Sequence, residues 1–124
     1  MLRTRPAEPS QHERLYRSLR GRIMVGALPP GARTIAGISL RDTRSRWGSC
    51  TSAGRLMFSW RLAMAPAEVL DYVAAHEVAH LAHLDHSPAF WAVVARLHPG
   101  WAARRDWLRR QGPSLQAWTF RGGA

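Results

Sequence analysis

The chain has 124 residues, of which 46% are hydrophobic, and its 18 basic and 8 acidic residues give a formal charge of +10. This length suits one domain, and the apolar content with six tryptophans excludes a charge-rich, aromatic-poor disordered chain. No apolar run approaches the roughly 18 residues that span a membrane, so we expect no integral membrane protein.

All the basic residues are arginine, and lysine is absent. Arginine binds phosphate well, which leaves a nucleic-acid partner open. A solvated surface with biased codon use explains the same composition, and we favour that interpretation. Cys50 is the single cysteine, so no internal disulfide is possible, and the N-terminus has no apolar leader. We therefore expect a reducing compartment, the cytoplasm.

Residues 1–37 are expected to form a loose tail followed by an amphipathic helix. Leu15, Leu19 and Ile23 recur at four-residue steps, which predicts a helix over residues 11–26. We treat this N-terminal region as separate from the unit that follows it.

A small sheet is expected at the start of the second unit, residues 38–120. Residues 38–47 are polar and charged, as is typical of an edge strand. Residues 48–54 are mostly Gly, Ser and Thr, which favour a turn. Apolar and polar residues then alternate over 55–64, which predicts a half-buried strand antiparallel to the first.

Three helices are expected after the sheet. The first is predicted from Pro66, a residue favoured at helix starts, to about Leu84. Ser87 and Pro88 are typical of the N-cap and first position of a second helix. The third is predicted over residues 101–111.

The most informative stretch is His76-Glu77-Val78-Ala79-His80, an HExxH pattern in the first of these helices. Residues at i and i+4 share one helix face, so both imidazoles can bind one metal, and zinc suits neutral imidazole nitrogen. Glu77 flanks the metal without binding it and can act as a general base. The alternative is a structural helix whose histidines are satisfied by hydrogen bonds, and the apolar flanks favour zinc.

A catalytic zinc needs a third protein ligand. The candidates are His83, Asp85, His86 and His98. In a straight helix His83 would lie about 4.5 Å beyond His80 along the axis, past the metal. His86 follows the predicted helix end, where a turn can bring it back. The spacing therefore favours His76, His80 and His86 as the ligand set.

Several other side chains are candidates for supporting the site. Tyr72 lies one turn before the first histidine, where it either hydrogen-bonds near the site or packs in the core. His83 faces the cleft or solvent, and Asp85 either orients a ligand imidazole or caps the turn. Arg46 and Arg61 either bind a substrate carboxylate or are ordinary surface arginines.

Separated segments of the chain occur together, in order, in one known family. They are residues 46–50 (RWGSC), 58–62 (FSWRL), 66–73 (PAEVLDYV), the HExxH pattern, 85–91 (DHSPAFW) and 95–108 (ARLHPGWAARRDWL). With these segments the chain resembles the YgjP-like zinc metallopeptidases, relatives of the SprT-like proteases, over roughly residues 39–118.

The resemblance implies an α+β, minimal zincin-like domain. It implies a small antiparallel sheet packed on the active-site helix, with two further helices after it. It also implies Zn²⁺ on His76, His80 and His86, Glu77 as the catalytic acid/base, and a peptide or protein substrate. Family members usually carry a longer N-terminal half, which residues 1–38 do not match.

The alternative is a nucleic-acid-associated or protein-interaction domain with a structural or vestigial zinc site. The charge of +10 and the six tryptophans favour it. Residues 12–33 also resemble the opening helix of GntR-type winged-helix regulators, although the helices that read DNA do not follow. We favour the zinc-dependent peptidase.

Overall fold

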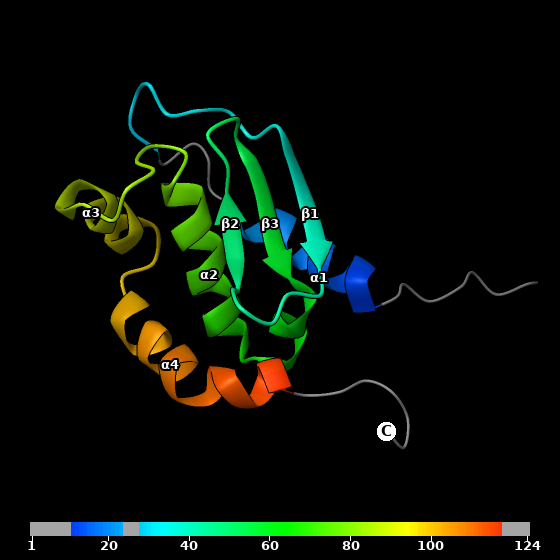
Figure 1. The fold of residues 1–124 in the computed structure, drawn as a ribbon. Helices are drawn as coiled ribbons and strands as arrows, with labels where there is room; N and C mark the ends of the chain where they lie inside the picture. Colours follow the sequence, from blue (N-terminus) through cyan, green and yellow to red (C-terminus); the bar gives the residue numbers. More distant parts are fainter. Residues whose placement is uncertain (1–10, 24–27, 118–124) are drawn as a thin grey trace, which may run out of the picture.

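The structure, a computed structural model, describes residues 11–23 and 28–117. A three-stranded sheet carries α1 and α2 against one of its faces (Figure 1). The elements in chain order are α1 (Gln11–Arg22), β1 (Gly37–Arg41), β2 (Gly48–Cys50), β3 (Arg55–Ser59), the 3₁₀ helix η2 (Trp60–Met64), α2 (Ala67–Ala79), α3 (Pro88–Leu97) and α4 (Trp101–Ala117). The expected α+β class is confirmed. None of the described helices is both long and apolar enough to cross a membrane.

The sheet has the strand order β1-β3-β2 and is mixed, not wholly antiparallel as expected. β1 pairs in parallel with β3, whereas β2 pairs antiparallel with it, with Gly48 opposite Phe58. The predicted strand over 38–47 is therefore wrong in its length and its pairing. After Arg41 the chain crosses to the far edge of β3, where residues 48–50, predicted as a turn, form the edge strand.

α2 is the central helix and carries most of the HExxH pattern. It packs against α1, α3, α4 and β2, so side chains around most of its circumference are buried. The helix ends at Ala79, although a helix to about Leu84 was predicted. The apolar pattern that suggested a longer helix extends past Ala79, because Leu81 is fully buried in the turn that follows. That turn is closed by i→i+3 bonds, including one from the Leu81 N–H to the Val78 carbonyl.

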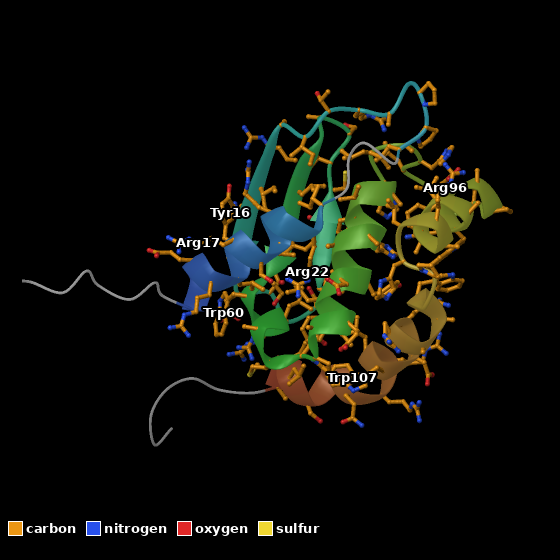
Figure 2. All side chains as sticks on the ribbon, turned by 180° about the vertical axis from the view of Figure 1, so that it is seen from behind. Tyr16, Arg17, Arg22, Trp60, Arg96 and Trp107 are labelled. Atoms are coloured by element: carbon orange, nitrogen blue, oxygen red, sulfur yellow. The ribbon has the colours of Figure 1, made fainter. Side chains whose placement is uncertain are left out.

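α1 belongs to the same core as the sheet and α2. Leu15 and Leu19 are buried in the cluster that contains the β3 side chains. Arg22, labelled in Figure 2, pairs with Asp71 of α2. The helix ends at Arg22, and residues 1–10 and 24–27 lie outside the described residues, as do the last seven. The division of the chain at 37/38 stays a prediction.

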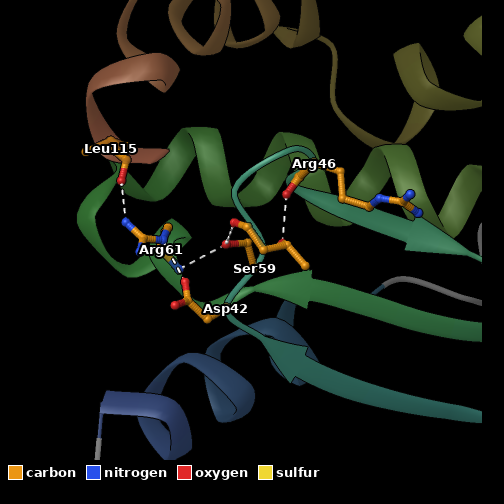
Figure 3. A network of polar contacts seen from close by, with 6 residues as sticks. Asp42, Arg46, Ser59, Arg61 and Leu115 are labelled. Atoms are coloured by element: carbon orange, nitrogen blue, oxygen red, sulfur yellow. Dashed lines mark hydrogen bonds and ion pairs between the residues drawn. The ribbon is translucent and has the colours of Figure 1, made fainter. Parts of the chain in front are cut away.

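Arg61 corrects the expectation for residues 55–64. The alternation stops at Ser59, and the Ser59 hydroxyl accepts a hydrogen bond from the Arg61 N–H, which starts η2 instead of extending β3. Arg61 is fully buried. Its Nε donates to Asp42 Oδ1 at 2.7 Å and its Nη1 donates to the Leu115 carbonyl at 2.9 Å (Figure 3). The prediction that Arg61 is a surface or substrate-binding arginine is wrong.

The last two helices begin where the sequence indicated. Ser87 is confirmed as the N-cap of α3, and its hydroxyl accepts from the Phe90 N–H. α4 was expected to end at Gln111, but it continues past Gly112 and Pro113 to Ala117. Tertiary contacts hold this extra segment: Gly112 lies against the Trp47 ring, and Arg61 binds the last turn.

We expect Asp42→Ala to lower the free energy of unfolding by about 1–3 kcal/mol, because it leaves the buried Arg61 guanidinium without its carboxylate. The matched control is Asp106→Ala, which removes an exposed i,i+4 pair with Arg110 and should cost no more than about 0.5 kcal/mol. Urea denaturation measures both. Equal losses in the two variants would contradict the role given to Arg61.

Candidate metal centre

Three histidine side chains converge beside the C-terminal end of α2. The ligand atoms of His76, His80 and His86 all lie within 4.8 Å of one another. The first is on α2, the second is its C-cap residue, and the third comes from the loop before α3. Within residues 11–23 and 28–117 this is the one group of metal-ligating side chains found.

His86 returns over α2 because α3 begins two residues after it. The Asp85 carboxylate accepts a hydrogen bond from the Ser87 N–H at 3.3 Å, and Ser87 then caps α3. The hydroxyl and backbone of Ser87 hold the pKa of Asp85 below its usual value. These contacts show Asp85 at the turn before α3, and an orienting role towards a ligand imidazole stays a prediction.

His83 lies outside the histidine cluster. A straight helix through His83 was expected, but α2 ends at Ala79. The backbone of His83 nevertheless acts on the cluster, since its carbonyl accepts from His80 Nδ1 at 2.9 Å. This bond orients the His80 ring and leaves its Nε2 free to bind an ion.

Tyr72 holds the His76 imidazole. Its hydroxyl lies 3.3 Å from His76 Nδ1, one helical turn away. Tyr72 is buried, and this burial raises the pKa of its hydroxyl to about 12. The group therefore stays protonated at neutral pH and remains available for the contact with His76.

Phe90 is a member of the site that the sequence argument missed. Its ring is fully buried and lies 4.3 Å from the His80 ring centroid, 5.0 Å from that of His76 and 5.1 Å from that of His86. Phe90 therefore supports all three imidazoles from one side. The sequence feature that could have identified Phe90 is its place in the first turn of α3, directly after the Ser87 N-cap, because this turn must pack beside His86.

Burial dominates the electrostatics of the histidines. Burial, together with the neighbouring His80 and His86, lowers the pKa of His76 to about 3. Burial also lowers the pKa of His80. Both rings are therefore neutral at neutral pH, the form in which imidazole binds metal ions. Three imidazoles this close, two of them oriented by other groups, fit a metal ion.

Glu77 is packed between α2 and β2 and is 6% exposed. A Cβ atom built on Gly48 would lie 2.9 Å from both Cγ and Oε2 of Glu77, so the carboxylate fits because Gly48 has no side chain. Burial raises the pKa of Glu77 to about 8, against the attraction of Arg46. A buried carboxyl with a perturbed pKa beside a histidine cluster is typical of functional sites.

Arg46 is exposed and directs its guanidinium away from the Arg61 network (Figure 3). Its carbonyl accepts a hydrogen bond from the Thr43 hydroxyl at 2.9 Å, which shapes the loop that enters β2. A contact of Arg46 with substrate stays a prediction. Cys50, in β2, is half-buried, and burial raises its pKa to about 11, so it stays a thiol at neutral pH.

Comparison with known families adds to this geometry. A family model described as YgjP-like, metallopeptidase domain, matches residues 13–111. The match begins inside α1, well before the residue 39 from which the sequence resemblance was traced. No curated protein and no solved structure matches the chain.

We expect Gly48→Ala to lower the free energy of unfolding by about 1–3 kcal/mol through overpacking against Glu77. In a Glu77→Ala background the same change should cost less by at least about 0.5 kcal/mol, because the two closest atoms, Cγ and Oε2 of Glu77, are gone and, of the three nearest atoms, only the Met57 carbonyl at 3.1 Å remains. Gly21→Ala is the control: nothing lies within 4 Å of a Cβ there, and alanine should be neutral or stabilising in α1. An equal cost of Gly48→Ala in both backgrounds would rule out the contact.

Proposed function

Because the chain belongs to the YgjP-like metallopeptidase family, we propose that it is a zinc-dependent peptidase with Glu77 as its general base. The observation that carries this proposal is the convergence of His76, His80 and His86 beside a buried carboxylate on the same helix. A structural metal site alone does not need such a carboxylate next to the first ligand.

We assign the three imidazoles as the zinc ligands. Zinc favours nitrogen donors, and hydrolytic zinc sites take three protein ligands and keep a fourth position open. When bound, zinc supplies a Lewis acid that activates water and polarises a carbonyl group. The Tyr72 hydroxyl contacts the His76 ring, and the His83 carbonyl accepts a hydrogen bond from the His80 ring. Such contacts hold ligand rings in place and raise the affinity of metal sites.

Glu77 carries the proton transfers in this proposal. Zinc held by the neighbouring histidines would lower the pKa of Glu77, because a nearby positive charge favours the carboxylate form. In that form Glu77 accepts a proton from the attacking water and delivers it to the leaving amine of the cleaved peptide bond. The side chain is confined between α2 and the backbone of β2 at Gly48, so it is held in place before substrate arrives. Such preorganisation supports general acid–base catalysis.

We expect substitution of a zinc ligand to weaken zinc binding much more than substitution of the neighbouring His83. We expect about one zinc per wild-type chain and no stoichiometric zinc in His80→Ala. His86→Ala should weaken zinc affinity by more than about 100-fold, since changes beyond the ligands typically cost about 10–100-fold. His83→Ala is the matched control and keeps the backbone carbonyl that orients His80. Metal analysis and chelator competition measure these affinities, and the reverse ranking of His83 and His86 would refute the assignment.

Replacing Glu77 should separate catalysis from metal binding. Glu77→Gln keeps the shape of the side chain and removes its basicity, so we expect zinc content and folding to be retained. Peptidase activity on casein should fall by at least about 10²–10⁴-fold. Activity that survives in the variant would remove Glu77 from the mechanism. Zinc bound to both proteins with no activity in either would favour a metal-stabilised interaction domain.

A further inference from the structure

A cavity of about 200 Å³ borders the proposed catalytic residues. Its walls come from three separate parts of the chain: Trp47 and Gly48 at the start of β2, Val73 on α2 and Leu108 on α4. His76 and Glu77 also line it, together with Tyr72. A group that occupies this cavity therefore contacts both the first proposed zinc ligand and the proposed general base.

The aromatic wall of this cavity is fixed from outside. A Cβ atom on Gly112 would lie 3.2–3.5 Å from the Trp47 indole, so α4 approaches this ring as closely as a glycine permits. Leu108 stands one helical turn before Gly112 on α4 and packs against the core. Val73, on α2, is buried in the core. The apolar walls of the cavity thus belong to the core or pack against it.

The chemistry of the walls selects the group that fits. Trp47, Val73 and Leu108 offer apolar surface, and the Tyr72 hydroxyl is already engaged with His76. An aspartate or glutamate side chain would lose its hydration there, and no arginine or lysine among the described residues lines the cavity to pair with it. An apolar side chain leaves no polar group unpaired and removes apolar surface from water.

We propose that this cavity, which we call the Trp47 pocket, receives an apolar side chain of the substrate residue next to the cleaved bond. The inference rests on the proposed peptidase function and names its substrate class: peptides with Leu, Met or Phe beside that bond. Leu108 is then a residue that determines specificity, because it sets the depth of the pocket from α4.

The test uses zinc-loaded protein and peptides identical except at one residue, which is Ala, Leu, Phe, Asp or Arg. Mass spectrometry locates the cleaved bond. We expect kcat/KM for cleavage beside Leu or Phe to exceed that for Asp or Arg by at least about tenfold, the discrimination an apolar pocket supplies. A preference for Asp or Arg in the wild type would overturn the proposal.

Two substitutions at Leu108 change the pocket in opposite directions. Leu108→Trp fills it and should lower kcat/KM for the Leu and Phe peptides towards that for the Ala peptide. Leu108→Ala deepens it and should raise the ratio of Phe to Leu cleavage. Leu40→Ala, a half-buried position on β1, is the control and should leave the ranking unchanged. Unchanged rankings in both Leu108 variants would overturn the proposal.

A binding measurement keeps the pocket testable if the proposed function fails. If the zinc-loaded wild type cleaves no peptide, the peptidase assignment falls, and the pocket is judged by NMR with N-acetyl-leucinamide and N-acetyl-aspartamide. We expect N-acetyl-leucinamide alone to shift the Trp47 indole N–H resonance, identified by its loss in Trp47→Phe, and Leu108→Trp to abolish the shift. No shift, or equal shifts with both amides, would overturn the pocket.

Discussion

The close approach of β2 to α2 at Gly48 is the constraint on which the candidate site depends. Because this residue has no side chain, the Glu77 carboxylate packs directly against strand backbone. The carboxylate is thereby buried, and its position is set by two elements that are far apart in sequence. The same approach brings Trp47 beside α2, where it forms one wall of the neighbouring cavity. One glycine thus serves the packing of the fold and the placement of the proposed base.

A fully buried guanidinium makes the second long-range connection. Arg61 joins the loop after β1, through Asp42, to the last turn of α4, through the Leu115 carbonyl. Burying a charge is costly, and the contacts with Asp42 and Leu115 help to offset that cost. The extension of α4 past Pro113 brings the acceptor carbonyl to Arg61. Gly112, which lies against Trp47, is three residues before Leu115 on α4, so the Arg61 network holds the part of the helix that supports this wall of the cavity.

The three imidazoles are arranged by groups that do not themselves bind an ion. Tyr72, the His83 backbone and Phe90 hold them from α2, the following turn and α3. Burial keeps at least two of the rings neutral at neutral pH. A metal ion entering such a site would not have to order the side chains or displace protons from these two rings. The geometry is therefore that of a preformed site, and its assignment to zinc stays a proposal.

The sequence by itself determined the features that depend on neighbouring residues. The α+β class, the helix that carries His76 and Glu77, and the Ser87 N-cap were predicted correctly because i,i+4 spacing and helix capping are local. Tertiary structure decided the rest. The pairing of β1 with β3 and the burial of Arg61 depend on contacts across 18 to 54 positions. A charged or small residue looks the same in sequence whether it faces water or fills a gap in the core. Only the tertiary structure distinguishes the buried Arg61 from an exposed arginine, or the closely packed Gly48 from a turn glycine. The reason is that burial depends on which residues the fold brings into contact with a side chain.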